Sequence, residues 1–322
     1  MDEVTLGTLL ASTLRVSAPL ILCALAGCLS ERSGVIDLGL EGKMLFTAFA
    51  AAAVGVSSGS MALALAVALL IGVALSMLHG YACVSHRGDQ VVLGMAITMT
   101  AAGLTVVLGI AWFKQGGQTP PLPDAVRLAP LFPALVEAVK GIPFVGTVIG
   151  LGLLSHDAFV YGSLLAVVAV WWLLYRTRFG LRLRAAGENP AMIDAAGVSV
   201  KGMRYAALAI NGVLSALAGS YLVLALTPSF IPNMTAGRGY MALAAMIFGK
   251  WHPLGALAAC LLFGFLEAAA IRLQGVALPG IGTVPVQAIQ ALPYLMTVVL
   301  LAGFIGQARA PKALGTPYVK ER

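Results

Sequence analysis

Long apolar runs follow one another along almost the whole chain. Windows of about 20 apolar residues, the length of helix that crosses ~30 Å of hydrocarbon, indicate nine segments. These are 9–29, 41–57, 61–83, 90–110, 157–175, 203–227, 239–249, 253–273 and 286–306. The pattern predicts an all-α integral membrane protein, a polytopic bundle of about nine transmembrane segments (roughly 8–10) that forms one domain over residues 1–322.

The segment 239–249 is shorter than the others. Eleven residues rising ~1.5 Å each cover only about half of the hydrocarbon thickness as a straight helix. We therefore expect some segments to be broken or re-entrant, with 239–249 as half of a broken helix.

Basic residues gather in the loops between apolar runs. The strongest cluster is Arg176, Arg178, Arg182 and Arg184, and basic loops face the cytoplasm in membrane proteins. Counting segments outward from this loop predicts an N-terminus outside and a cytoplasmic C-terminus. The same rule explains the net charge of +7, so we expect no nucleic-acid partner.

Composition supports this interpretation. The chain is 60% hydrophobic and 10% charged, with a mean hydropathy of +0.94, whereas soluble domains have about 25% charged residues. The four cysteines lie in apolar segments without metal-ligand spacing, so we interpret them as packing residues and expect no metal site.

The stretch 111–156 is expected to be an external loop. Its prolines, at positions 120, 121, 123, 130, 133 and 143, rule out one continuous helix. Residues 144–154 are apolar but too few to span, so they either dip into the membrane or pack against the bundle.

The second half of the cytoplasmic loop 176–202 predicts a short helix over 190–196. Asn189 is a favourable N-cap, Pro190 suits the first helical position, and Gly197 suits a left-handed C-terminal cap. A helix this short is unstable alone in water, so a cytoplasmic partner is expected to bind it. The alternative is a solvated basic loop with an incidental turn.

Three motifs resemble one known family. They are the loop from Arg176 to Gly197 (RTRFGLRLRAAGENPAMIDAAG), the stretch Ser30–Gly42 (SERSGVIDLGLEG), and Gly239–Gly249 (GYMALAAMIFG) continuing to Pro253-Leu-Gly255. Together they resemble the permeases of bacterial ABC importers for simple sugars, nucleosides and branched-chain amino acids, and are most similar to the nucleoside-type branch. Asp37 departs from the asparagine that is more usual there.

The resemblance implies a permease subunit in the bacterial plasma (inner) membrane that forms the path for a small polar solute, a nucleoside, purine or simple sugar. It implies separate ATP-binding cassette ATPase subunits, a second permease that is a homologous but different chain, an extracytoplasmic solute-binding protein, contact with lipid, and no cofactor. It also implies that the loop couples to the ATPase through Arg184, Gly187, Glu188, Asn189, Pro190, Asp194, Ala195, Ala196 and Gly197.

A nucleotide site can be sought directly, because a phosphate-binding loop needs the pattern GxxxxGK[ST]. The nearest string runs from Asp37 to Met44 and departs from that pattern at both ends. We therefore expect no ATPase activity in this chain and do not interpret it as an enzyme.

Four polar residues near or within apolar segments are candidates for the translocation path: Asp37, Glu41, Asn211 and Glu267. Buried charges in a membrane face protein or water. Glu267 either lines the path or, as we favour, pairs with a basic or amide neighbour. Asn211 lies on a face of small residues and is expected at a close helix contact.

Two other functions compete. An ion-coupled secondary transporter also uses broken helices and intramembrane acids, but it leaves the coupling loop unexplained. An intramembrane enzyme is the second alternative, yet the GVSSG string at 55–59 lies in a turn between helices, where no nucleophile and base can be identified.

Overall fold

The computed structural model describes residues 3–139, 142, 146–273, 277–278, 282–283, 291, 295 and 309–320. Regular structure in these residues is helical except for two short antiparallel strands, β1 (Ala277–Leu278) and β2 (Gly282–Thr283). The helical class predicted from the apolar runs is therefore confirmed.

Within the described part of the chain, 7 helices are long and apolar enough to cross a membrane. They are α1 (Glu3–Arg32), α2 (Leu40–Ser58), α3 (Met61–Gly80) continuing into the π-helical turn η1 (Tyr81–Ser85), α4 (Gln90–Phe113), α6 (Ala158–Arg176), α9 (Val200–Tyr221) continuing into η4 (Leu222–Leu226), and α11 (Pro253–Leu273). Each coincides with a predicted segment. The predicted segment 286–306 lies outside the described residues apart from positions 291 and 295, so the count of nine stays a prediction.

The short segment predicted at 239–249 forms α10 (Arg238–Phe248). A glycine stands at each end of it, Gly237 with φ +81° before the helix and Gly249 after it. The positive φ of Gly237 is left-handed, so a right-handed helix cannot run through this residue. The chain therefore reaches α10 through the non-helical stretch 227–237, and a tight turn then leads into α11.

The helices differ sharply in burial. The most apolar windows of α1, α2 and α9 are 67%, 78% and 78% buried, whereas those of α3, α4 and α6 are only 22%, 17% and 28% buried. The first group therefore forms the buried interior of the bundle, and the second is largely exposed at its surface. An apolar rim around a packed interior is the arrangement expected of a protein surrounded by lipid.

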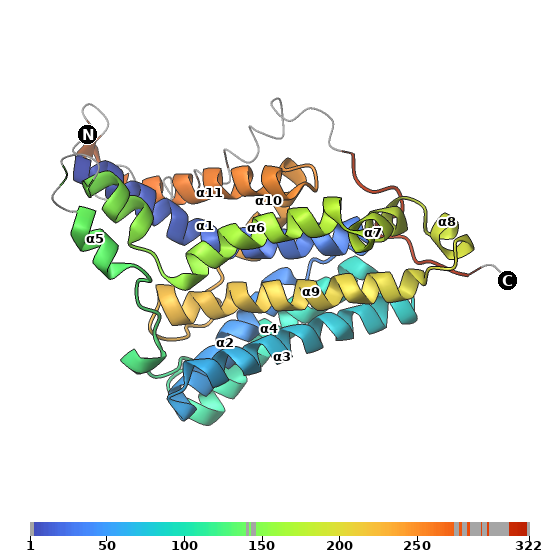
Figure 1. Ribbon diagram of the computed structural model, residues 1–322. Helices are drawn as coiled ribbons and strands as arrows, with labels where there is room; N and C mark the ends of the chain where they lie inside the picture. Colours follow the sequence, from blue (N-terminus) through green and yellow to red (C-terminus); the bar gives the residue numbers. More distant parts are fainter. Residues whose placement is uncertain are drawn as a thin grey trace.

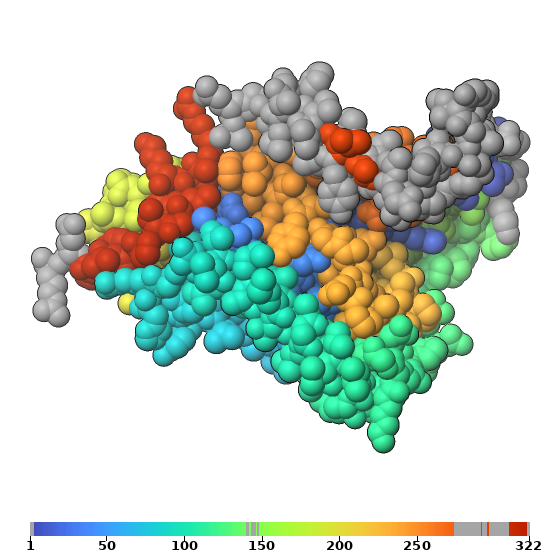
Figure 2. Space-filling view, turned by 180° about the vertical axis from the view of Figure 1, so that it is seen from behind, coloured from blue at the N-terminus to red at the C-terminus, as the bar shows by residue number. Residues whose placement is uncertain are grey.

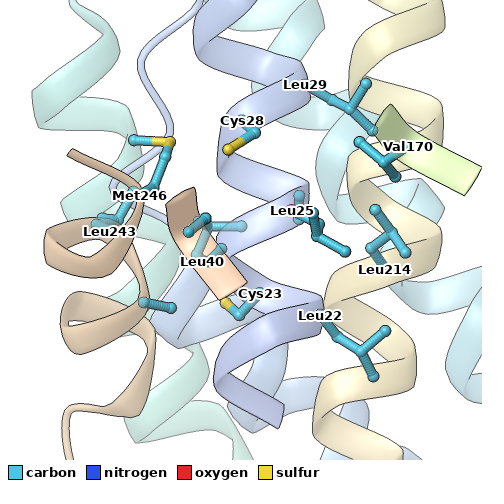
Figure 3. Close-up of a cluster of buried hydrophobic side chains, with 14 of the residues drawn as sticks. Leu22, Cys23, Leu25, Cys28, Leu29, Leu40, Val170, Leu214, Leu243 and Met246 are labelled. Atoms are coloured by element: carbon cyan, nitrogen blue, oxygen red, sulfur yellow. The ribbon is translucent and has the colours of Figure 1, made fainter. Parts of the chain in front are cut away.

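The centre is filled by aliphatic and sulfur-containing side chains. Leu25, Cys28 and Leu29 of α1 lie in one cluster with side chains from α2, α9 and α10 (Figure 3). All four cysteines are free and buried, which agrees with their prediction as packing residues.

The close crossing of α9 with α3 depends on small residues, as predicted for the face around Asn211. A Cβ on Gly72 of α3 would stand 2.6 Å from the carbonyl oxygen of Gly212 on α9, and a Cβ on Gly212 would stand 2.6 Å from that of Gly72. The two backbones touch, which only glycine permits at both positions.

The stretch predicted as an external loop has little regular structure. It contains the 3-10 turn η2 (Asp124–Val126), the short helix α5 (Pro133–Val139) and the π-helical η3 (Gly146–Leu154). Of the two alternatives for 144–154, the described residues favour packing, because Gly152 lies against Gly7 and Leu10 of α1. Backbone hydrogen bonds from Thr119 to Phe230 and from Leu128 to Leu224 bind the loop to the chain after α9.

Two further helices lie between α6 and α9: α7 (Arg178–Glu188) and α8 (Pro190–Ala195). They lie at the same end of the molecule as the described C-terminal residues, and the N-terminus and α5 lie at the opposite end (Figure 1).

Candidate functional site

The predicted short helix is present as α8, one residue shorter than expected. The Asn189 side-chain oxygen accepts a hydrogen bond from the Met192 backbone N–H at 3.1 Å, and Pro190 occupies the first helical position. Gly197 has φ +79°, the left-handed conformation expected of a C-terminal cap. All three local signals therefore act as predicted.

The sequence prediction missed α7, whose residues we had assigned to a basic loop. The Thr177 hydroxyl accepts from the Gly180 N–H at 3.1 Å and caps the helix. Gly180, Leu183 and Gly187 are buried on one face, at the spacing of an amphipathic helix. The signal for this helix was a threonine N-cap followed by apolar or small residues at helical spacing. The arginines between them made the stretch look like a basic loop.

The candidate coupling residues divide into buried and exposed groups within the α7–α8 unit (residues 178–197). Arg184 is half-buried over the Tyr175 ring, 4.6 Å from its centre, and Gly187 is buried. Asp194 pairs with Lys320 at 3.5 Å. The exposed members are Glu188, Asn189, Ala195, Ala196 and Gly197.

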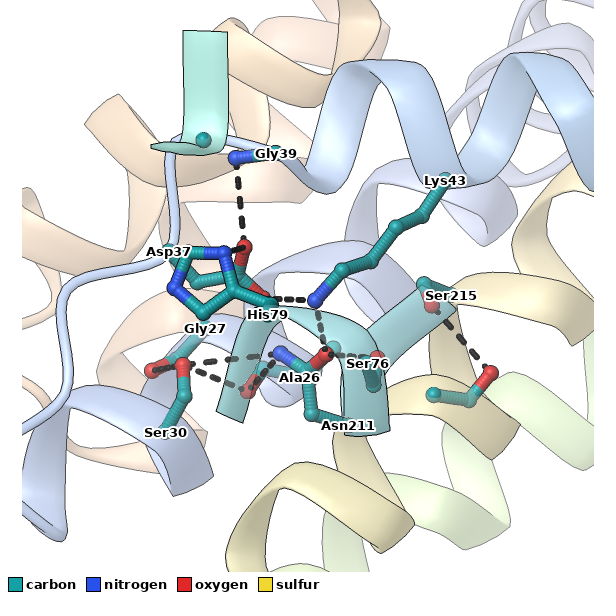
Figure 4. A network of polar contacts seen from close by, with 12 residues as sticks. Ala26, Gly27, Ser30, Asp37, Gly39, Lys43, Ser76, His79, Asn211 and Ser215 are labelled. Atoms are coloured by element: carbon teal, nitrogen blue, oxygen red, sulfur yellow. Dashed lines mark hydrogen bonds and ion pairs between the residues drawn. The ribbon is translucent and has the colours of Figure 1, made fainter. Parts of the chain in front are cut away.

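Two of the four candidate path residues meet in a fully buried cluster. The Lys43 ammonium of α2 donates to Asp37 Oδ2 at 2.6 Å and to Asn211 Oδ1 of α9 at 3.1 Å, and all three side chains are inaccessible to solvent (Figure 4). Burial opposes ionisation of Asp37, but Lys43 and His79 together hold the pKa of its carboxyl below the ordinary value.

Further hydrogen bonds complete this cluster. Ser76 of α3 donates to Asn211 Oδ1 at 3.0 Å, and the Asn211 amide donates to the Ala26 carbonyl of α1 at 3.0 Å. The Gly39 N–H donates to Asp37 Oδ1 at 3.1 Å. The cluster thus joins α1, α2, α3 and α9, and buried charges are tolerated when they are paired and hydrogen-bonded in this way.

The other two candidates converge on the start of α10. Glu41, in the first turn of α2, accepts from the Gly237 N–H at 2.9 Å and from the Gly239 N–H at 2.6 Å. Its carboxylate satisfies N–H groups at the helix N-terminus that would otherwise lack acceptors. Beside it, Glu267 of α11 pairs with Arg238 at 2.7 Å, and each side chain is 22% exposed.

Sequence reasoning missed Lys43 and Arg238, although a usable signal existed. Lys43 lies inside a predicted apolar segment, where a charge requires a partner just as Glu41 does. Arg238 directly precedes another such segment. A search for every charge in or next to an apolar segment would have identified both residues as needing a partner, though not which partner.

Comparison with known protein families matches residues 9–304 to the branched-chain amino acid transport system permease component family. The chain belongs to this family. It is therefore a permease subunit of an ABC transporter, a multi-pass membrane protein that works with separate ATPase and binding-protein subunits, and ATP is hydrolysed on the ATPase. The family resemblance seen in the sequence is confirmed, and the ion-coupled alternative loses its support.

Curated relatives of this permease match over nearly their whole length. The guanosine ABC transporter permease protein NupQ of Bacillus subtilis is 38% identical, covering 98% of this chain and 97% of the relative. The nucleoside ABC transporter permease protein NupC of Lactococcus lactis is 36% identical, covering 99% and 98%. TsgC13 of Haloferax volcanii, whose name assigns it to glucose transport, is 33% identical, covering 91% and 90%.

A solved structure shares the fold of this permease. It is an inward-facing ABC transporter assigned to the metal-chelate type, with a TM-score of 0.50 and 16% identity, covering 92% of this chain and 85% of that chain. At that identity the likeness concerns the fold alone.

Proposed function

We propose that this permease is a subunit of a bacterial inner-membrane importer for nucleosides. The observation that carries the proposal is whole-length similarity, at 38% and 36% identity, to two permeases named for guanosine and nucleoside transport. A simple sugar is the second candidate solute, favoured by the 33% identity to the relative named for glucose.

The α7–α8 unit is the proposed contact with the ATPase. Leu181 is 62% exposed and Met192 59% exposed, at an end of the molecule that also carries exposed Arg178 and Arg182. Basic side chains disfavour contact with hydrocarbon, so these apolar groups need a protein partner to cover them. The candidate residues Asn189, Ala195, Ala196 and Gly197 surround Met192 in the chain and would form the rest of that contact.

The proposed orientation places this end in the cytoplasm. Described basic residues at the ends of spans there include Arg176, Lys201 and Lys250, and the exposed Lys312 lies in the C-terminal segment. The positive-inside rule then supports an external N-terminus and an external stretch 111–156, which would face the extracytoplasmic binding protein.

The start of α10 is the proposed wall of the translocation path. Arg238 and Glu267 are partly exposed there, and Glu41 fixes the N-terminus of the half-helix. In transporters such half-helices end near the membrane midplane at the solute site. Asp37 and Asn211, which are fully buried, are proposed to support α2 behind this wall. The path would be completed by a second permease, a homologous but different chain.

Competition for uptake tests the solute class. In cells that lack other nucleoside importers and express the whole transporter, we expect uptake of radiolabelled guanosine. An excess of unlabelled nucleosides should reduce that uptake to background, and an excess of glucose should leave it unchanged. Inhibition by glucose together with no inhibition by nucleosides would contradict the proposed solute and favour a sugar.

A further inference from the structure

The C-terminal residues 309–320 are bound across the end of the molecule that carries the α7–α8 unit. The Ala313 N–H donates to the Gly187 carbonyl at 2.8 Å, and the Gly315 N–H donates to the Gly34 carbonyl at 3.1 Å. This segment, shown in red, covers the neighbouring elements in Figure 2. Two successive hydrogen bonds thus connect the end of α7 with the linker between α1 and α2 (residues 33–39).

Arg204 of α9 binds both the α1–α2 linker and the C-terminal segment where these two cross. Only 1% of its surface is exposed, and it donates to the Ser33 carbonyl at 3.2 Å and to the Thr316 carbonyl at 3.1 Å. Burying a guanidinium is costly unless its donors find acceptors. Here Nε finds its acceptor in the α1–α2 linker and Nη1 finds its acceptor in the C-terminal segment, so Arg204 ties the two together.

A glycine stands in each of the three segments where they cross. A Cβ on Gly34 would stand 2.9 Å from Arg204 Nη2 and 3.1 Å from the Ala313 carbonyl oxygen, and one on Gly315 would stand 2.9 Å from Ile36 Cδ1. A Cβ on Gly187 would collide with the Arg32 carbonyl oxygen. Gly34 and Gly315 also have φ values of +92° and +76°, which L side chains rarely adopt.

The far part of the C-terminal segment reaches the proposed coupling helix. Lys320 pairs with Asp194 of α8 at 3.5 Å, and Tyr318 and Lys320 line a pocket together with Asp194 and Gly197. An exposed ion pair contributes little stability by itself. The position of this ion pair matters more than its strength. Through it, the C-terminal segment contacts α8 as well as the α1–α2 linker.

We propose that residues 309–320 are a strap that makes the α7–α8 unit and the α1–α2 linker move together. Asp37 lies in that linker, three positions beyond Gly34, and Lys43 connects it to Asn211 of α9. A displacement of α8 therefore passes through the strap to the linker and then to the centre of the bundle. The inference rests on the proposed function of α8 as the ATPase contact, and Arg204 acts in it as a positioning residue.

The test measures uptake and ATP hydrolysis on the same proteoliposomes, which contain the whole transporter and are supplied with solute-loaded binding protein. Gly315→Val introduces a clash with Ile36, and its matched control is Lys312→Val at an exposed position of the same segment. We expect Gly315→Val to lower solute taken up per ATP hydrolysed about tenfold, with hydrolysis retained. Lys312→Val should behave like the wild type.

Two further variants separate a coupling role from a folding role. A chain ending at residue 308 should assemble with its partners and show the same loss of uptake per ATP. Arg204→Lys, which keeps a donor at the crossing, should retain more coupling than Arg204→Met, which has none. An unchanged ratio of uptake to hydrolysis in Gly315→Val and in the shortened chain would overturn the strap, and so would a proportional fall of both activities in assembled complexes.

A readout without transport keeps the strap distinguishable from the proposed function. In the isolated wild-type permease, carboxypeptidase should stop at about residue 316, where the segment is hydrogen-bonded to Arg204. In Gly315→Val it should digest further into the segment. Uptake by the wild type without ATP would refute the proposed function and leave this result standing. Equal trimming of wild type and Gly315→Val would refute the strap even where uptake is ATP-dependent.

Discussion

Replacing Lys43 with methionine is expected to lower the free energy of unfolding by about 3–5 kcal/mol. The change leaves the Asp37 carboxylate inaccessible to solvent and without the ammonium that now lies 2.6 Å away. It also removes a donor from Asn211. The measurement is the thermal unfolding midpoint of the purified permease in detergent, together with the monodisperse fraction after extraction.

The control for this prediction removes both charges. In the double variant Asp37→Asn/Lys43→Met, the asparagine oxygen can still accept from Gly39, and neither position of the buried ion pair carries a charge. Because a buried ion pair can be replaced by uncharged groups at little cost, the double variant should regain most of the stability. Lys312→Met, at an exposed position, should be neutral. A double variant as unstable as Lys43→Met would show that the pairing does not explain the effect.

Replacing Gly197 with valine is expected to uncouple ATP hydrolysis from uptake. A left-handed conformation costs an L residue about 1–2 kcal/mol, and α8 has only the six residues Pro190–Ala195 to resist fraying. That cost corresponds to a loss of roughly 5–30-fold in the population of the folded cap. Uptake per ATP hydrolysed should therefore fall by about that factor in proteoliposomes that contain the whole transporter.

Gly59 offers a matched control. Like Gly197 it has a positive φ, +65° against +79°, and a Cβ at either position would meet nothing within 4 Å. Gly59 caps the C-terminus of α2. In the proposed orientation it lies on the side of the membrane opposite to α8. Gly59→Val should therefore introduce similar strain while leaving uptake per ATP unchanged. Equal loss of coupling in both variants would mean that backbone strain anywhere, and not the cap of α8, disturbs transport.

Features that depend only on residues close together in the sequence could be predicted from the sequence. The caps of α8 lie within nine residues of one another, from Asn189 to Gly197, and each acts through its own backbone preference, so the sequence alone predicted them. The long apolar helices were predictable for the same reason, because length and composition decide insertion. The boundary between α7 and α8 was harder, since Asn189 ends one helix and begins the next.

The pairings across the bundle could not be predicted in that way. Lys43 meets Asn211 at a separation of 168 positions, and Glu41 meets Gly239 at a separation of 198. Which groups meet depends on how α2 packs against α9 and α10, and hydropathy carries no information on that. Hydropathy identified Glu41 as an acid in an apolar segment. It could not show that the carboxylate oxygens accept hydrogen bonds from backbone N–H groups at the N-terminus of α10.

The start of α10 inside the bundle has a physical explanation. A helix that begins inside the bundle leaves backbone N–H groups without acceptors, and in a membrane each such group costs several kcal/mol. Glu41 accepts two of these donors, and its negative charge also lies at the positive end of the helix dipole. An acid in an apolar segment thus permits the half-helix that we propose as the wall of the path.

This permease moves its solute with energy from ATP hydrolysed on another subunit. The most direct measurement is guanosine uptake into proteoliposomes that contain the whole transporter, with the binding protein outside and ATP enclosed. We expect uptake that requires both ATP and the binding protein and that is lost with a non-hydrolysable ATP analogue. Uptake driven by a proton or sodium gradient in the absence of ATP would contradict it.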